Sequence, residues 1–169
     1  VLLSAGNMFN TGNAPTGAHT YRSLEIANGA TYKATTGNTT LVGQPSGDYI
    51  LRNHDGGTFT HSGGTVTLSR SSSSGSKYAK FGEDVFNNLI IDETNTSGQS
   101  VIPVVGVLNM AGDLTVTDGM LRAYGGTGAI DVDGDVLISS GGTLDLETTQ
   151  LADGGPTASF GSLTIASGG

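Results

Sequence analysis

The sequence predicts an all-β protein built as a parallel β-solenoid, or β-helix, with coils of about 22 residues. The main observation is a short sequence motif. In it two apolar residues flank one other residue, and small polar residues and a glycine follow. It occurs at Ser23–Gly29, Gly112–Gly119, Gly134–Gly141 and Ser162–Gly168. Each occurrence predicts a short strand followed by a turn. Repeated units of this kind bury their apolar face only by stacking on one another.

Spacing and composition support the same fold class. The dipeptide Gly112-Asp113 recurs as Gly134-Asp135 one coil length later, and Gly161-Ser162 follows after a slightly longer interval. The 169 residues include 28 glycines, and the apolar fraction of 36% suits a narrow core better than a broad one. An antiparallel β-sandwich or jelly roll is the alternative, because it also combines short strands with glycine-rich turns.

The first half of the chain predicts a lead-in and then a repeat region. Residues 1–20 are rich in Gly, Asn and Thr and predict a lead-in segment or loop, and residues 21–80 predict an N-terminal β-repeat region. Its turns are predicted at glycines, where positive φ costs little. The expected strands are Leu24–Ile26, Thr31–Lys33, Tyr49–Arg52, Thr58–His61 and Thr65–Leu68. The expected turns are Asn28-Gly29, Asp55-Gly56-Gly57 and Ser62-Gly63-Gly64.

The second half, residues 81–169, predicts an acidic β-solenoid region. A low-complexity loop, Ser71–Ser76, precedes a boundary between the two regions near residue 80. We interpret this boundary as a division within one continuous rod and not as a border between two domains. A strand opens this region at Phe86–Ile91. The expected inward-facing residues are Leu114, Val116, Leu121, Ile130, Val132, Val136, Ile138, Leu144 and Leu146.

Charge and residue types exclude several classes of function. Residues 1–80 hold six Lys/Arg and three Asp/Glu, whereas residues 81–169 hold one and twelve. The acidic half repels nucleic acid and anionic membranes. The absence of cysteine excludes disulfides and cysteine-based zinc sites. No run of 18 apolar residues predicts a membrane span. Because the chain starts at Val1 and stops just after a new repeat opens, we expect a piece of a longer protein or a processed product.

Three segments carry a resemblance to known proteins: Gly57–Leu68, Phe86–Ile91 and Gly112–Val116. Their pattern resembles the Gly/Thr/Ser-rich β-solenoid repeats of bacterial surface and secreted proteins, and the repeats of phage tail and virion-fibre proteins. The resemblance implies a structural role outside the cell or on the virion surface. No capping or trimerisation motif is recognisable.

The strongest polar cluster is a candidate metal site. If Ile130 and Val132 point inward, Asp131, Asp133 and Asp135 share the outer face, and Asp113 stacks near Asp135 one coil away. Oxygen ligands at this density suit Ca²⁺, which would relieve the repulsion between like charges. A solvated acidic face is the alternative interpretation.

Catalytic groups are harder to find, and no catalytic residue is predicted. The adjacent acids Glu83-Asp84 and Asp92-Glu93 point to opposite faces of a strand, so neither pair forms an acid–base couple. The three histidines are scattered, and His54-Asp55 predicts a turn. Tyrosines are candidate contact residues or core fillers: Tyr21, Tyr32, Tyr49, Tyr78 and Tyr124.

We therefore expect a non-enzymatic structural protein of an extracellular assembly, with a phage or virus tail or fibre placed first. A secreted bacterial adhesin or surface-filament module that binds glycans or cells is the alternative, and a polysaccharide-degrading β-helix is the third hypothesis. Open coil ends expose unpaired strand edges. We therefore expect self-association into a homo-oligomer, either a trimer or a polymer, and contacts with other structural subunits, and a surface glycan or receptor is a further expected partner.

Overall fold

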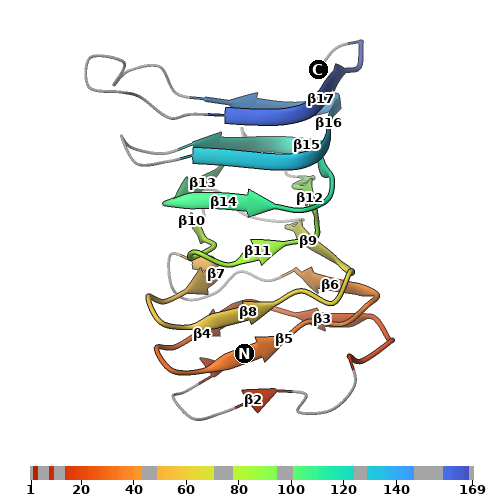
Figure 1. The fold of residues 1–169 in the computed structure, drawn as a ribbon. Coiled ribbons are helices and arrows are strands. Elements are labelled where there is room, and N and C mark those ends of the chain that lie inside the picture. Colours follow the sequence, from red (N-terminus) through yellow and green to blue (C-terminus); the bar gives the residue numbers. More distant parts are fainter. Residues whose placement is uncertain are drawn as a thin grey trace, which may run out of the picture.

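The computed structural model describes residues 2–3, 8–9, 14–42, 49–70, 78–94, 101–123, 129–146 and 158–167. This part of the chain is all-β and contains no helix. Its strands form a stack with the N-terminal and C-terminal ends of the chain at opposite ends (Figure 1). In chain order, the first strands are β1 (Leu2–Leu3), β2 (Met8–Phe9), β3 (His19–Tyr21), β4 (Leu24–Ile26), β5 (Thr31–Lys33), β6 (Asn38–Leu41), β7 (Tyr49–Asn53), β8 (Thr58–Thr60) and β9 (Thr65–Ser69). The others are β10 (Tyr78–Lys80), β11 (Val85–Phe86), β12 (Asn88–Asp92), β13 (Val101–Val105), β14 (Val107–Met110), β15 (Leu114–Ala123), β16 (Ala129–Asp145) and β17 (Ala158–Ile165).

The strands form three ladders, and each coil contributes one strand or strand segment to each ladder. The first ladder runs through β1, β4, β7, β10, β13 and the C-terminal parts of β15 and β16. The second runs through β3, β6, β9, β12, the N-terminal part of β15, the middle of β16 and β17. The third contains β2, β5 and β8 and, further up, β11, β14 and the first residues of β16 and β17.

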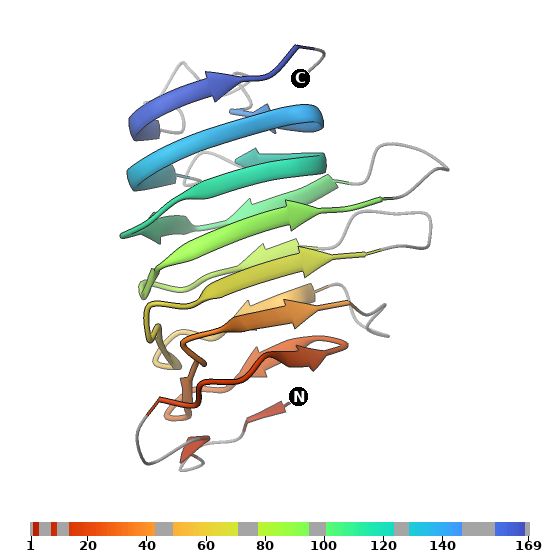
Figure 2. The same ribbon diagram turned by 90° about the vertical axis from the view of Figure 1, so that its right-hand side faces the viewer.

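Every pairing between described strands is parallel, which confirms the predicted β-solenoid and excludes the antiparallel sandwich. Figure 2 shows the strands of successive coils lying above one another on one side of the stack. The predicted spacing is also confirmed. Leu114 pairs with Val136, and Val136 pairs with Leu163, so the register repeats at the same two intervals as the glycine-containing dipeptides of the sequence.

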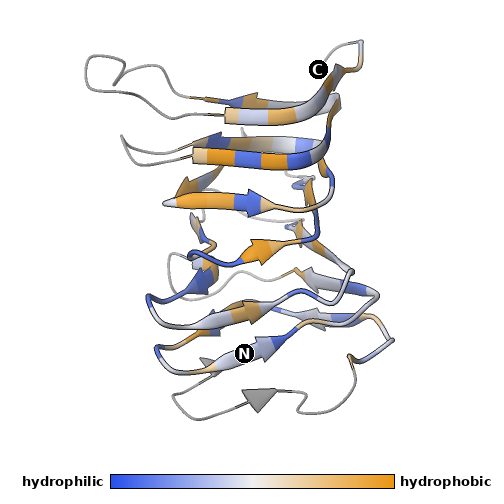
Figure 3. Ribbon diagram, viewed as in Figure 1, coloured by the Kyte–Doolittle hydropathy of each residue, from blue (hydrophilic) through white to orange (hydrophobic). Residues whose placement is uncertain are grey.

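The core is a narrow column inside the three ladders. Burial alternates along β14 and along the first residues of β16, where Figure 3 also shows hydrophobic and hydrophilic residues alternating, because successive side chains of a strand point to opposite faces. All nine residues expected to face inward in the second half are buried or packed against the core. In the third ladder an aromatic stack forms: Phe59 and Phe86 have ring centroids 4.1 Å apart, and Tyr32 lies 5.7 Å from Phe59.

The predicted turns are confirmed at their glycines. Gly29, Gly56 and Gly63 have φ values of 73°, 79° and 80°, a region that glycine enters at little cost. These turns change the chain direction between one ladder and the next, so they set the corners of the coil.

Pairing continues through residue 80. Strand β10 pairs with β7 on one side and with β13 on the other, although the charge changes sign there. Strands β1 and β2, inside the stretch expected as a lead-in, pair with β4 and β5. The expected loop Ser71–Ser76 lies outside the described residues.

Candidate functional site

The acidic cluster predicted from the sequence lies on the outer face of β16. Asp131, Asp133 and Asp135 are exposed, and the intervening Val132 is buried, as the alternation predicts. Asp113 lies one coil away, where its side chain reaches Asp135. The predicted positions are therefore confirmed: the three aspartates share the outer face of the strand, and Asp113 lies beside Asp135.

The carboxylates of this cluster connect successive coils. The backbone N–H of Asp113 donates to Asn88 Oδ1 at 2.9 Å, and the backbone N–H of Asp135 donates to Asp113 Oδ1 at 2.9 Å. Ser162 Oγ then donates to Asp135 Oδ1 at 2.7 Å. We call Asn88, Asp113, Asp135 and Ser162 the Asx ladder. It continues the hydrogen bonding between coils at a corner where the backbone leaves a donor to satisfy.

A glycine precedes three of the four ladder residues, Asp113, Asp135 and Ser162, and close contact between coils explains it. A Cβ on Gly112 would lie 2.2 Å from Asn88 Oδ1, and a Cβ on Gly134 would lie 2.5 Å from Asp113 Oδ1. A Cβ on Gly161 would lie 2.7 Å from the carbonyl oxygen of Gly134. The repeated Gly-Asp motif thus combines close approach of two coils with a hydrogen bond between them.

The calcium hypothesis stays a prediction. Within the described residues, no group of three or more His, Asp or Glu side chains converges in a way that could hold a metal ion. Asp131 accepts a hydrogen bond from Ser159 Oγ, so three of the four candidate ligands are engaged by groups of the neighbouring coil.

A second polar group lies at the corner between β10 and β11. A hollow of about 180 Å³ there is lined by His54, Asp55, Gly56, Gly57, Gly82, Glu83 and Asp84. Asp84 Oδ2 accepts hydrogen bonds from the side-chain amide of buried Asn53 at 2.8 Å and from the backbone N–H of Phe59 at 2.6 Å. The neighbouring Glu83 is exposed. Asp84 therefore connects its own coil to the preceding one.

A hydrogen bond and an ion pair at the same corner also cross between coils. His54 Nε2 lies 2.7 Å from Glu25 Oε1, and Lys80 Nζ lies 2.7 Å from Asp55 Oδ1. The hydrogen bond from Lys80, and then its charge, lower the pKa of the Asp55 carboxyl below its usual range. His54-Asp55 lies at a turn, as predicted, and each residue has a partner on another coil.

Sequence reasoning missed one buried ion pair. Arg70 Nε lies 2.8 Å from Glu93 Oε2, and both side chains are fully buried. The pair could have been found from the register, because Arg70 and Glu93 are offset along the chain by the same interval as the paired residues Val66 and Leu89.

The tyrosines divide between core and surface. Tyr32 is fully buried, and desolvation raises the pKa of its phenol. Tyr49 and Tyr78 are half-buried on the first ladder, with ring centroids 5.6 Å apart, and the Arg52 guanidinium lies 4.9 Å from the centroid of Tyr49. Tyr124 lies outside the described residues.

The comparisons with known proteins found no relative, so any functional argument rests on the geometry of this chain. No protein-family model, curated protein or solved structure matches this chain. The class that the fold defines is a strand-rich β-solenoid repeat protein. Within the described ranges, no helix is long and apolar enough to cross a membrane.

Proposed function

We propose that this chain is a structural, non-enzymatic β-solenoid component of an extracellular assembly, with a phage or virus tail or fibre as the first candidate. The observation that carries the proposal is the use of its outward polar groups. The Asx ladder, the Lys80–Asp55 pair and the Arg122–Asp145 pair each join neighbouring coils. Side chains engaged in this way make a stiff rod, and the rod supplies length and direction to an assembly.

Electron microscopy of the native source tests this proposal. Antibodies raised against the 169-residue chain are used for immunogold labelling of particles and cell surfaces from the source culture. Gold on a tail, fibre or surface filament supports the structural function. Gold confined to the cell interior would overturn both the location and the assembly.

A glycan-binding adhesin module is the second candidate, and the Tyr49–Tyr78 pair favours it. Two neighbouring, partly exposed aromatic rings offer a stacking surface for a sugar, and Arg52 beside them suits an acidic sugar. The test is a glycan array with the wild-type chain and with Tyr78→Ala. Binding that Tyr78→Ala removes and that Val85→Ala keeps would support this function, since Val85 is an exposed residue of another ladder.

The third hypothesis, a polysaccharide-degrading β-helix, gains no support from the described residues. Asp131 and Asp133 share the outer face of β16, but Asp131 accepts a hydrogen bond from Ser159 of the next coil. We therefore do not extend it to a proposal.

A further inference from the structure

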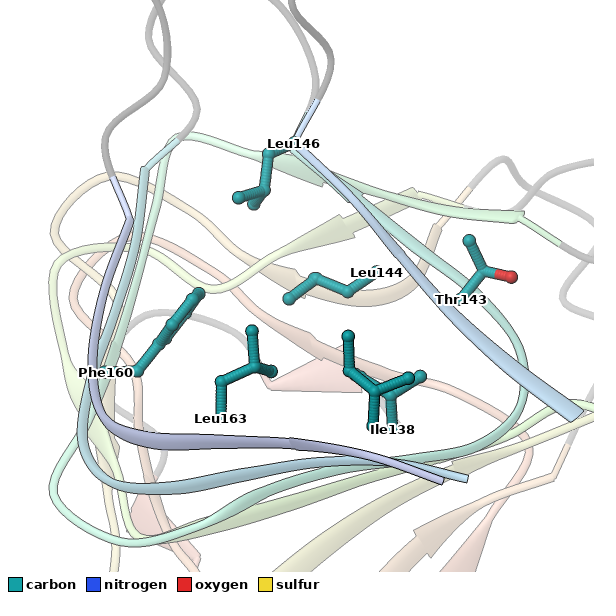
Figure 4. Close-up of a pocket in the computed structure, with 7 residues that line it drawn as sticks. Ile138, Thr143, Leu144, Leu146, Phe160 and Leu163 are labelled. Atoms are coloured by element: carbon teal, nitrogen blue, oxygen red, sulfur yellow. The ribbon is translucent and has the colours of Figure 1, made fainter. Parts of the chain in front are cut away.

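The apolar hollow of about 280 Å³ in the last described coil is part of the solenoid interior. Leu144, Leu146, Phe160 and Leu163 point into the outline of the coil around it (Figure 4). The strand partner of Leu163 one coil below is Val136, which belongs to the buried core. The hollow therefore continues the core column, and we assign no ligand to it.

The turn between β4 and β5 contains the one Asn-Gly dipeptide of the sequence, Asn28-Gly29. Both residues are exposed, and Gly29 has a φ of 73°. The backbone N–H of Ala30 donates to the carbonyl oxygen of Ala27 at 3.0 Å and closes the turn. An asparagine followed by glycine is prone to deamidation. The next backbone nitrogen attacks the side-chain amide, and glycine has no Cβ to hinder that approach.

Deamidation at this dipeptide needs water and no other reagent. The backbone nitrogen of Gly29 forms a bond to Cγ of Asn28, and the Cγ–Nδ2 bond breaks. The amide nitrogen leaves as ammonia, with the proton that the backbone nitrogen gave up. Water then opens the cyclic imide, and attack at Cγ gives aspartate, whereas attack at the backbone carbonyl carbon gives isoaspartate. Either product carries a negative charge where the amide was neutral.

The next coil holds the nitrogen that would react. The backbone N–H of Gly29 donates to the carbonyl oxygen of Gly56 at 2.9 Å. The side-chain amide of Asn28 lies against the same glycine, because a Cβ on Gly56 would lie 3.0 Å from Asn28 Oδ1 and 3.2 Å from its Cγ. The nitrogen must lose its proton and turn toward Cγ before it can attack, so the hydrogen bond to Gly56 has to break first.

The same two coils are joined on both sides of this hydrogen bond. The backbone N–H of His54 donates to the carbonyl oxygen of Ile26 at 2.9 Å, and the backbone N–H of Thr58 donates to the carbonyl oxygen of Ala30 at 2.9 Å. Because these bonds flank Gly29 along the chain, its nitrogen becomes free only when the whole corner opens. Local opening of this kind occurs in native proteins without global unfolding.

We propose that Asn28 is a deamidation site that the coil above keeps closed, so that the reaction marks chains in which this corner has opened. The modification also prevents the corner from closing again. The new carboxylate would face the turn that contains Asp55, and like charges repel. Isoaspartate adds an atom to the main chain of a turn whose closure depends on the hydrogen bond between Ala30 and Ala27.

The experiment incubates the native chain and the chain unfolded in guanidinium chloride side by side at mildly alkaline pH. Peptide mapping by mass spectrometry follows aspartate and isoaspartate at residue 28. We expect the native chain to react at least about tenfold more slowly, the factor that a closed corner favoured by about 1.4 kcal/mol imposes. Asn53 is the internal control, because His54 follows it and hinders the attack, so it should react far more slowly than Asn28 in the unfolded chain.

A pair of variants tests the role of the coil above. A Cβ on Gly57 would lie 2.9 Å from the carbonyl oxygen of Ile26, so Gly57→Ala should force the two coils apart and speed the native reaction severalfold. Gly17→Ala, where no atom lies within 4 Å of the added Cβ, should react like the wild type. Hydrogen exchange of the Gly29 amide in the wild type measures the opening without any variant, and we expect strong protection.

Four results would overturn the inference. No product at Asn28 in the unfolded chain would remove the site, and equal rates in the native and unfolded chains would remove the protection. An unprotected Gly29 amide in the native chain would show that Gly56 does not hold it. Equal native rates for Gly57→Ala and Gly17→Ala would show that the coil above does not control the reaction.

Discussion

At the scale of single residues, Asp84 shows how one side chain joins three stretches of chain. Its Oδ2 accepts from the amide of Asn53 and from the backbone of Phe59, and Asn53 is fully buried. Removing the acceptor leaves a buried amide with one hydrogen bond fewer, and such losses cost about 1–3 kcal/mol. We expect Asp84→Ala to lower the free energy of unfolding by that amount, measured by urea denaturation.

Glu83→Ala is the matched control for Asp84→Ala. Glu83 is the neighbouring acid and is exposed, so its truncation should change the free energy of unfolding by less than about 0.5 kcal/mol. Equal effects of the two substitutions would show that Asp84 does not hold the corner.

The buried phenol of Tyr32 should make the stability of the folded chain depend on pH in the alkaline range. Burial raises the pKa of its phenol above the ordinary value of 10.0, so the folded chain keeps the proton at a pH where the unfolded chain loses it. The contribution of the buried neutral phenol to the free energy of unfolding is fully present below pH 10, and it is lost as the pH rises above 10. Relative to Tyr32→Phe, the wild type should lose about 1.4 kcal/mol of stability per pH unit above 10.

The measurement for Tyr32 is urea denaturation of both proteins at several pH values from neutral to alkaline. The other tyrosines are common to both, so their titration cancels in the difference. At neutral pH the two should differ by about 1 kcal/mol, the usual net contribution of a hydrogen bond, because the substitution removes the hydroxyl that lies 3.5 Å from Thr39. A difference that does not depend on pH would contradict the argument.

At the scale of one element, the strand β16 depends on glycine where it crosses the coil below. A Cβ on Gly134 would lie 2.5 Å from Asp113 Oδ1 and 2.6 Å from the carbonyl oxygen of Gly112. Overpacking of this kind costs about 1–3 kcal/mol. We expect Gly134→Ala to lower the melting temperature clearly. Gly17→Ala, where no atom lies within 4 Å of the added Cβ, should leave it nearly unchanged.

The hydrogen bonds of the Asx ladder also predict how the chain responds to removal of metal ions. Because Asp113 and Asp135 already satisfy donors of the next coil, we expect a chelator to leave the melting temperature unchanged. Differential scanning calorimetry with EDTA and with added CaCl₂ checks this. A rise with CaCl₂ that Asp133→Asn removes would instead support the calcium site.

At the scale of the whole molecule, each coil contacts only its neighbours, so the cost of a substitution depends on its height in the stack. Leu121 is fully buried between coils, whereas Leu163, in the last strand of the stack, is 50% exposed. Truncating a buried leucine costs about 2–5 kcal/mol. We expect Leu121→Ala to lower the free energy of unfolding by that amount. Leu163→Ala should lower it by about half as much or less, because half of the Leu163 surface is already exposed to water.

Thermal unfolding followed by circular dichroism provides the measurement. Equal losses would show that the stack melts as one unit without regard to position.

The sequence by itself determined the fold class, several of the strands, the glycine turns of the first half and the inward-facing residues of the second half, whereas β1, β2 and β3 lie in or at the edge of the stretch expected as a lead-in. Alternation within Leu114–Val116 or Val136–Ile138 and the glycine turns are local, and the intervals at which they recur already contain the register. Only the tertiary structure decided what the outward polar groups do. Asp113 accepts from the backbone of Asp135, and Arg70 meets Glu93, because neighbouring coils place them together. Pattern along one strand cannot reveal such contacts, since each depends on the residue that the next coil brings above it.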